Sequence, residues 1–319
     1  MAFLKRINSK AKAETNTGFG SNASSYGGRF ITKNGNANVR KSGIGLFDSI
    51  SWYHTMLNIP RWKFFLIIVL FYFLVNCFFA SLYLLNGIEH LQGARVYTLA
   101  DKFGQAFFFS IQTYTTVGYG HISPSGFTAS FTAAVEALFG LLSFAIATGL
   151  FYGRFSKPKA HIMFSENAII APYNNGKALM MRITPYKNAN LTDVEAKVTL
   201  GLQMEENGKI TNKFFFLDLE MSRVNSLNLS WTLVHPITEI SPFYGFSEAE
   251  FRNSVGEIIV FVKAFDDMFS NTVVKRTSYV FDEIVYGAKF VPMFTRNDNA
   301  TKTLLHIDKL NDYEKVALS

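Results

Sequence analysis

A strongly apolar stretch without a single charge runs from Phe64 to Leu85 and reads FFLIIVLFYFLVNCFFASLYLL. As a helix rising about 1.5 Å per residue, it would be about 33 Å long, which is enough to cross the hydrocarbon core of a bilayer. A second apolar stretch runs from Phe127 to Tyr152 and contains one acidic residue, Glu136. These two stretches restrict the chain to folds that hold two membrane-spanning helices.

Basic residues stand at one end of each predicted span. Arg61 and Lys63 precede the first span, and Arg154, Lys157 and Lys159 follow the second. Because basic residues beside a span are retained in the cytoplasm, this distribution predicts a multi-pass protein of the cell (inner) membrane with both termini cytoplasmic. In a membrane protein, the net charge of +7 favours anionic lipid over nucleic acid as a partner.

The residues before the first span have two compositions. Residues 1–44 are rich in Gly, Asn, Ser, Lys and Arg and predict a disordered basic arm. Residues 45–60 can place Leu46 and Ile50 on one helical face, with Trp52 at headgroup level, which predicts an interfacial slide helix. An ordinary amphipathic helix packed on a soluble core is the alternative.

Between the spans lies an apolar segment, Phe103–Thr113, that is too short to cross a membrane and predicts a re-entrant helix. The sequence TTVGYG follows it, and irregular backbone at membrane depth is tolerated only in a water-filled cavity or inside protein. A ring of backbone carbonyls can replace the hydration shell of K⁺ without charge, and Gly118 and Gly120 permit the dihedral angles that aim successive carbonyls at one axis. We therefore interpret the following residues as an ion-binding potassium selectivity filter: Thr116, Val117, Gly118, Tyr119 and Gly120. Because one chain with two spans cannot encircle an ion, the filter also predicts a homotetramer.

From about residue 160 the sequence alternates apolar and polar residues. Segments such as KALMMRITPY, VEAKVTLGLQM and EIIVFVKAF predict strands, and Asn175-Gly176 and Asn207-Gly208 are typical of hairpin turns. Several short strands at this spacing predict a β-sandwich over residues 158–319. The predicted fold class is therefore membrane α plus β, with a transmembrane pore domain of two helices, a re-entrant pore helix and a filter over residues 61–157.

Several stretches outside the filter carry a resemblance to a known family. They are RWK (61–63), TGLFYGRFSKPKAHIMFSENAII (148–170), SPFYGFS (241–247) and RTSYVFDEIVYGAKFVPMF (276–294). On these residues the chain resembles the prokaryotic inward-rectifier potassium channels of the KirBac type, over about residues 46–315. The resemblance implies an immunoglobulin-like cytoplasmic β-sandwich after the pore domain, and passive conduction of K⁺ ions with no organic cofactor.

The resemblance also implies what single residues do. Tyr152 matches the bulky gate residue where the inner helices cross, although an interfacial aromatic anchor is the alternative. Phe144 matches the pore-lining position where strongly rectifying relatives carry an acid, so weak rectification is expected. Gly149 is the candidate hinge, and Gly140 could serve as well or allow close packing. The family's lipid-binding cluster corresponds to Arg61, Lys63, Arg154, Lys157 and Lys159, for which simple positive-inside anchoring is the alternative.

Four residues around the filter stand out from the family pattern or from their surroundings. Gln112 replaces the usual Glu of the pore helix, and His121-Ile122 replaces the Asp, or the more distant Arg, that follows the filter in relatives. Glu136 is an ionisable residue at membrane depth and hence a functional candidate. We expect Gln112 and Glu136 to support the filter from behind, near each other; a Glu136 that faces the water-filled cavity is equally compatible with the sequence.

Other function classes fit the sequence less well. A potassium channel of another two-helix class does not account for the β-rich C-terminal half. A membrane-anchored β-sandwich that acts as a binding module leaves TTVGYG and the re-entrant helix unexplained. An enzyme finds no support, because the six histidines and the single cysteine, Cys77, form no metal-ligand spacing, and no nucleophile motif or phosphate-binding glycine loop is present.

Overall fold

The computed structural model describes residues 7–15, 17–18, 29–43, 45, 51–95, 97–187, 190–206, 209–296 and 302–318. The chain forms two compact units. Residues 42–157 make up a helical unit, and residues 158–319 together with residues 1–41 make up a β-unit.

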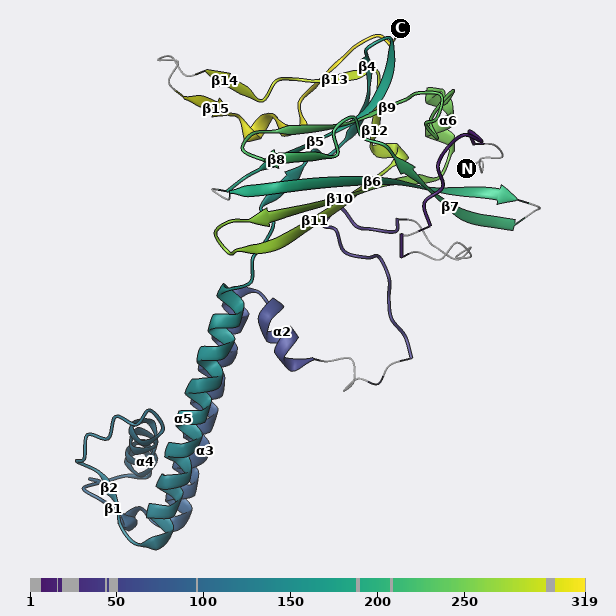
Figure 1. Cartoon of the computed structure of the whole chain (residues 1–319). Helices are drawn as coiled ribbons and strands as arrows, with labels where there is room; N and C mark the ends of the chain where they lie inside the picture. Colours follow the sequence, from purple (N-terminus) through teal and green to yellow (C-terminus); the bar gives the residue numbers. More distant parts are fainter. Residues whose placement is uncertain are drawn as a thin grey trace. The chain divides into compact units, whose positions relative to one another are not determined.

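Two long apolar helices dominate the helical unit: α3 (Arg61–Asn86) and α5 (Phe127–Phe155). Among the described residues, these are the helices that are long and apolar enough to cross a membrane. They run side by side (Figure 1) and contact each other at both ends: the ring centroids of Phe64 and Phe151 lie 5.1 Å apart, and the side-chain amide of Asn86 donates to the hydroxyl of Thr132. Most of the other apolar side chains of α3 and α5 are exposed, as expected of surfaces that face lipid.

Shorter elements complete the helical unit. Helix α4 begins with a capping box in which Thr98 and Asp101 exchange hydrogen bonds, and its apolar face is buried against α3. Of the predicted slide helix, the structure shows α2; residues 46–50 lie outside the described residues. The shorter elements are α2 (Trp52–Asn58), η1 (Ile88–His90), β1 (Leu91–Gln92), α4 (Leu99–Tyr114) and β2 (Ser123–Pro124), with β1 paired to β2.

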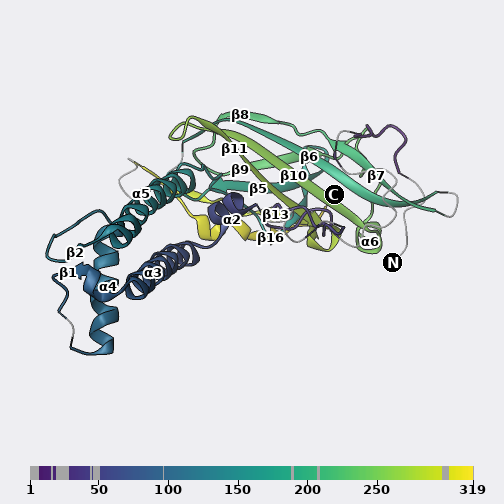
Figure 2. The same ribbon diagram turned by 90° about the horizontal axis from the view of Figure 1, so that it is seen from below.

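Two five-stranded sheets build the β-unit. In the first sheet β10 lies between β6 and β11 (Figure 2), β7 lies beyond β6, and β8 also pairs with β6. These strands are β6 (Leu191–Glu206), β7 (Lys209–Leu217), β8 (Arg223–Ser226), β10 (Gly256–Asp266) and β11 (Asn271–Val280). The second sheet has the order β12-β4-β5-β3 with β9 on β5, and its strands are β3 (Ile162–Phe164), β4 (Ala168–Tyr173), β5 (Gly176–Pro185), β9 (Trp231–Pro236) and β12 (Ile284–Tyr286).

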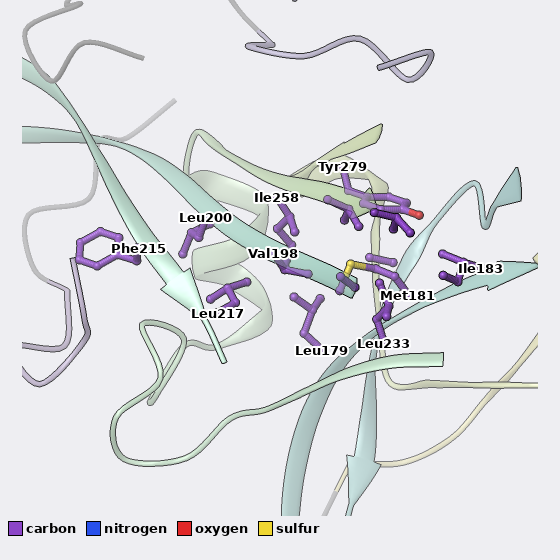
Figure 3. Close-up of a cluster of buried hydrophobic side chains, with 14 of the residues drawn as sticks. Leu179, Met181, Ile183, Val198, Leu200, Phe215, Leu217, Leu233, Ile258 and Tyr279 are labelled. Carbon is purple, nitrogen blue, oxygen red and sulfur yellow. The ribbon is translucent and has the colours of Figure 1, made fainter. Parts of the chain in front are cut away.

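The core of the β-unit lies between these two sheets (Figure 3). Val198 and Ile258 of the first sheet are fully buried, as are Leu179 and Met181 of the second. Each of these strands alternates inward apolar residues with outward ones, which is the pattern that predicts a sandwich. The predicted β-sandwich is therefore confirmed. Outside the two sheets lie α6 (Glu248–Asn253), η2 (Phe281–Glu283), β13 (Ala288–Phe290), β14 (Phe294–Arg296), β15 (Thr303–Leu305), η3 (Ile307–Asn311) and β16 (Tyr313–Lys315).

Part of the N-terminal arm packs on the β-unit, although the sequence predicts disorder there. Phe30 and Ile31 are buried with Phe214 and Ile259. The backbone amides of Phe30 and Ile31 both donate to the buried carboxylate of Glu257. The expectation of a disordered arm fails for these residues. Burial of two apolar side chains and the hydrogen bonds to Glu257, which is far away in the sequence, hold them in place although the surrounding sequence is rich in Gly and Asn.

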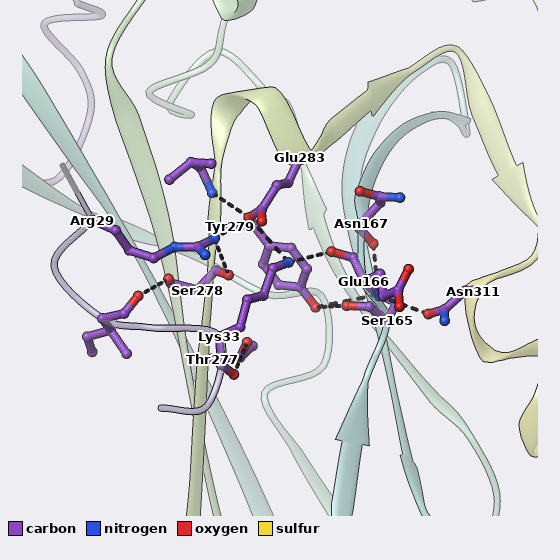
Figure 4. A network of polar contacts seen from close by, with 12 residues as sticks. Arg29, Lys33, Ser165, Glu166, Asn167, Thr277, Ser278, Tyr279, Glu283 and Asn311 are labelled. Atoms are coloured by element: carbon purple, nitrogen blue, oxygen red, sulfur yellow. Dashed lines mark hydrogen bonds and ion pairs between the residues drawn. The ribbon is translucent and has the colours of Figure 1, made fainter. Parts of the chain in front are cut away.

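Polar contacts extend this attachment (Figure 4). The guanidinium of Arg29 donates to the carbonyl of Ser278 at 3.1 Å, and the ammonium of Lys33 lies 3.2 Å from the carboxylate of Glu283. The Lys33 ammonium also lies 4.3 Å from the ring centroid of Tyr279, close enough for a cation–π contact. Burial lowers the pKa of Lys33, and the nearby Glu283 opposes that shift.

Candidate functional site

The filter segment, residues 116–120, starts directly after the end of α4. The backbone amides of Val117 and Gly118 both donate to the carbonyl of Gln112, at 2.9 and 3.3 Å. The amide of Thr116 donates to the carbonyl of Thr113 at 3.0 Å. These bonds attach the first half of the segment to the last turn of the helix, so any movement of α4 is passed to the segment.

The backbone of this segment alternates in handedness. Thr116, Gly118 and Gly120 have φ of 59°, 55° and 81°, whereas Val117 and Tyr119 between them are not in the positive-φ region. In a β-strand successive carbonyls point to opposite sides, and this alternation turns successive peptide planes toward the same side. A row of neutral oxygens on one side of the chain is what a dehydrated monovalent cation requires.

Two features set this segment apart from an ordinary loop: the backbone angle of Thr116 and the exposure of two large side chains. Thr116 is not a glycine, yet it has a positive φ, a conformation that costs of order 1–3 kcal/mol and clusters at functional sites. Val117 and Tyr119 have 54% and 76% of their surface exposed on the single chain. Neither side chain is therefore covered by the described residues of its own chain.

Helix α5 approaches the end of α4 at Gly140. A Cβ added to Gly140 would lie 1.9 Å from the carbonyl oxygen of Tyr114, the last residue of α4. Gly149, in contrast, has no atom within 4 Å of such a Cβ. The structure thus assigns close packing to Gly140, and it leaves Gly149 with steric freedom to serve as the predicted hinge.

Glu136 lies behind α4 but not against Gln112. It is completely buried, its Oε2 accepts a 2.6 Å hydrogen bond from the hydroxyl of Tyr83, and its Oε1 is hydrogen-bonded to the hydroxyl oxygen of Ser110. The expected neighbour Gln112 instead serves the filter segment through its backbone carbonyl. The burial also argues against the alternative that Glu136 faces the water-filled cavity, since its carboxyl group is fully buried within the described residues.

Phe144 and Tyr152 lie two turns apart on α5. Their exposed fractions are 73% and 75%, whereas Phe151 packs between Phe64 and Phe65 of α3. The side of α5 that carries Tyr152 is therefore not covered by the described residues of its own chain. This leaves both aromatic side chains available to face a pore.

The basic residues at the span ends fall into two kinds. Arg61, Lys63 and Lys157 are exposed, and the Lys157 ammonium donates to the amide oxygen of Asn58 at 3.1 Å. Lys159 is also exposed and belongs to the β-unit. Arg154 is half-buried: its guanidinium donates to backbone carbonyls of α2 and its cap and lies 4.8 Å from the Phe64 ring centroid. Arg154 is thus engaged within the chain, whereas the lysines and Arg61 reach solvent.

Sequence reasoning did not find the polar partners of Glu136. Tyr83, Ser110 and Asn76 are each at most 1% exposed and lie on α3 or α4. The available signal was weak but present, because Asn76 and Ser110 are polar residues inside apolar runs. In the part of the chain that the structure describes, no group of His, Cys, Asp and Glu could hold a metal ion.

Comparisons with known proteins cover both units. The family model described as the inward rectifier potassium channel C-terminal domain matches residues 162–319, and the one described as an ion channel matches residues 64–157. The chain is 33% identical over 283 residues to the inward rectifier potassium channel Kirbac3.1 of Paramagnetospirillum magnetotacticum, covering 86% of this chain and 92% of that protein. It is 25% identical to the G protein-activated inward rectifier potassium channel 2 of Pongo abelii, covering 85% of this chain and 69% of that protein. For the Mus musculus protein of the same name the identity is 26%, and the shares are 85% and 68%.

Proposed function

The chain belongs to the inward rectifier potassium channel family, and we propose that four copies assemble into a passive, potassium-selective channel whose filter is formed by residues 116–120. The family consists of ion channels rather than enzymes. The observation that carries the proposal is the alternation of φ at Thr116, Gly118 and Gly120. Four such segments around one axis would surround a K⁺ ion with neutral carbonyl oxygens. These oxygens would bind the ion strongly enough to replace its water and weakly enough to release it.

The proposed gate lies at the cytoplasmic end of α5, which is the inner helix of the channel. Tyr152 is exposed on the side that α3 leaves uncovered, so four Tyr152 rings could meet across the axis and exclude water. Gly149 is one turn away and has space around it, which supports bending of α5 at this position. Rotation or bending of the inner helices would then open the pathway.

Anionic lipid is the proposed modulator. Arg61, Lys63, Lys157 and Lys159 are exposed near the span ends, and each basic group at an anionic leaflet contributes about 1 kcal/mol. The positive-inside distribution supports the same placement, with both termini in the cytoplasm and the protein in the cell membrane. Because the guanidinium of Arg154 already donates to α2, we propose that this residue connects α2 to the gate helix instead of serving as a primary lipid contact.

Uptake of radioactive Rb⁺ into proteoliposomes tests the proposal. We expect uptake that Ba²⁺ blocks and that excess Na⁺ does not compete with, for the wild type in at least one of a neutral and an anionic lipid mixture. A Gly118→Ala variant is the matched control, because it changes one methyl group at a φ of 55° without removing any contact. Silence of the wild type and of Tyr152→Ala in both mixtures would refute the channel. It would favour the alternative that the spans only anchor a β-sandwich binding module.

A further inference from the structure

Four buried polar side chains form a cluster behind the pore helix α4. Asn76 and Tyr83 come from α3, Ser110 from α4 and Glu136 from α5. All four lie at most 1% exposed. The cluster therefore joins three helices of the helical unit at one point, in surroundings that are otherwise apolar.

The side-chain oxygens of the cluster form a continuous series of contacts. Tyr83 Oη lies 2.6 Å from Glu136 Oε2, and Ser110 Oγ contacts Glu136 Oε1. The same Ser110 oxygen lies 3.0 Å from Asn76 Oδ1. It also lies 3.2 Å from the backbone carbonyl oxygen of Asn76, so the serine hydrogen has acceptors on α3 as well as on α5.

Three oxygen–oxygen contacts need three hydrogens. A tyrosine and a serine supply one hydroxyl hydrogen each, and an amide oxygen supplies none. If the carboxyl group were ionised, two hydrogens would have to serve three contacts, and one pair of acceptors would face each other without a hydrogen. Each of the three contacts has its own hydrogen if the carboxyl group of Glu136 is protonated and supplies the third one.

The orientation of the Asn76 side-chain amide argues against the alternative, in which Glu136 is ionised and Asn76 supplies the third hydrogen. An ionised Glu136 is possible only if the amide turns over, so that Asn76 Nδ2 donates to Ser110. In the observed orientation Nδ2 donates to the carbonyl of Tyr72 at 2.8 Å. Turning the amide would place Asn76 Oδ1 at that distance from the carbonyl oxygen of Tyr72. Two acceptor oxygens would then face each other without a hydrogen, which is unfavourable.

The surroundings also favour a neutral group. The ion pairs of the described residues do not include Glu136. An ionised carboxylate buried without a cation is strongly unfavourable, whereas a protonated acid with both oxygens hydrogen-bonded is not. Hydrogen count, amide orientation and charge environment thus agree.

We propose that Glu136 is held as a neutral carboxylic acid and that it completes a directed hydrogen-bond chain that positions the pore helix. In this chain Tyr83 donates to Glu136, Glu136 donates to Ser110, and Ser110 donates to Asn76. Ser110 lies just before Gln112 on α4, and the Gln112 carbonyl holds the filter segment. Displacement of Ser110 therefore displaces the filter, and these are positioning residues rather than ion ligands. The consequence for selectivity rests on the proposed channel function, but the protonation of Glu136 does not.

Infrared difference spectroscopy of the full-length protein in membranes at neutral pH tests the protonation directly. Exposed carboxyl groups are ionised at this pH. We expect wild type minus Glu136→Gln to show a protonated carboxylic acid C=O band that the variant lacks. Tyr83→Phe removes the hydrogen bond to that C=O, so the band should move to higher frequency. A difference spectrum that contains carboxylate bands only would overturn the proposal. If Glu136→Gln fails to assemble, wild type against Tyr83→Phe gives the same decision from whether the protonated band shifts.

Ion selectivity tests the positioning step. Glu136→Gln is neutral, and its amide can accept from Tyr83 and donate to Ser110, so the ratio of Rb⁺ to Na⁺ uptake should stay close to that of the wild type. Glu136→Ala breaks the chain, and the ratio should fall by about tenfold or more, which corresponds to the loss of one buried hydrogen bond. A Glu136→Gln variant as defective as Glu136→Ala, or a Glu136→Ala variant as selective as the wild type, would overturn the positioning proposal. Absence of flux in both the wild type and Tyr152→Ala would instead refute the channel function and leave the spectra to decide the protonation.

Discussion

The guanidinium of Arg154, on the inner helix, donates to the carbonyl oxygen of Ile59, the residue that ends α2, across 2.5 Å. A second guanidinium nitrogen donates to the carbonyl of Met56 at 3.0 Å. The last carbonyls of a helix have no partner within that helix. Arg154 supplies one from the gate helix, so α2 and the end of α5 move together.

Replacing Arg154 should therefore affect stability, whereas replacing an exposed basic residue should not. We expect Arg154→Gln to lower the free energy of unfolding by about 1–3 kcal/mol per chain, because half-buried carbonyls lose their donor. Arg61→Gln, at an exposed position, should change it by less than about 0.5 kcal/mol. Thermal unfolding in neutral detergent measures both. Equal melting temperatures for the two variants would refute the assignment of Arg154 as the link to α2.

The two glycines of α5 should respond in opposite ways to alanine. Gly140→Ala places its Cβ against the Tyr114 carbonyl at the end of the pore helix, so we expect loss of selective flux. Gly149→Ala meets no atom and should raise the helix propensity of α5 by about 1 kcal/mol. It should therefore leave assembly intact and reduce opening only, if Gly149 is the hinge. Size-exclusion chromatography and Rb⁺ uptake separate these outcomes; normal selective flux through Gly140→Ala would contradict the packing account.

Phe144 should make the channel a weak rectifier. Its exposed, neutral ring offers no charge to hold a polyamine or Mg²⁺ in the pore. We expect little voltage-dependent block of the wild type by cytoplasmic spermine and a clear increase of block in Phe144→Asp, with Phe144→Asn as the uncharged control. Single-channel recordings in planar bilayers measure this. Strong block of the wild type that Phe144→Asn abolishes would contradict the prediction.

Acid should destabilise the β-unit through His235. This ring is buried, with Nδ1 2.6 Å from the Asp218 carbonyl and Nε2 2.8 Å from the Ser241 hydroxyl, and burial lowers the pKa of His235. An unfolded histidine has a pKa of about 6.5, so the unfolded chain takes up the proton first as the pH falls. The stability that neutral His235 contributes above that pH is lost as the pH falls through the folded pKa.

Hydrogen exchange at the amides of β9 checks this prediction. Protection, corrected for the intrinsic exchange rate, should hold above about pH 6.5 and fall as the pH drops below it, because the unfolded chain then takes up the proton before the folded chain does. His235→Gln should be less stable than the wild type above about pH 6.5, and its protection should depend less on pH. The other histidines are unchanged in this variant, so the pH dependence that they cause serves as an internal control. An unchanged pH dependence in the variant would sink the assignment to His235.

The local chemistry of the pore was accessible to sequence reasoning because it is carried by neighbours in the chain. Gly118 and Gly120 reveal the unusual backbone, a charge-free run reveals α3, and an apolar run with a single acidic residue reveals α5. The β-sandwich follows from alternation and turn residues. Each of these signals lies within one window of the sequence, where periodicity and turn chemistry apply.

Contacts between distant residues could not be predicted in the same way. Glu136 was recognised as a functional candidate, but its partners Tyr83 and Ser110 lie on two other helices, and no spacing rule links them. The burial of Phe30 on Glu257 is likewise a long-range contact inside a segment whose composition suggests disorder. Arg154 was assigned to lipid from its charge and position alone, whereas its engagement with α2 depends on how that helix ends.

The reversal potential of Tyr152→Ala channels, with K⁺ on one side of a planar bilayer and Na⁺ on the other, tests the central claim most directly. Removing the ring at the proposed gate separates the question of the filter from the question of opening. The account predicts a potential displaced strongly in the direction that K⁺ alone would set, and a smaller displacement when Gly118→Ala is added. A conducting Tyr152→Ala channel whose reversal potential lies near zero would contradict the claim that the carbonyls of residues 116–120 select K⁺.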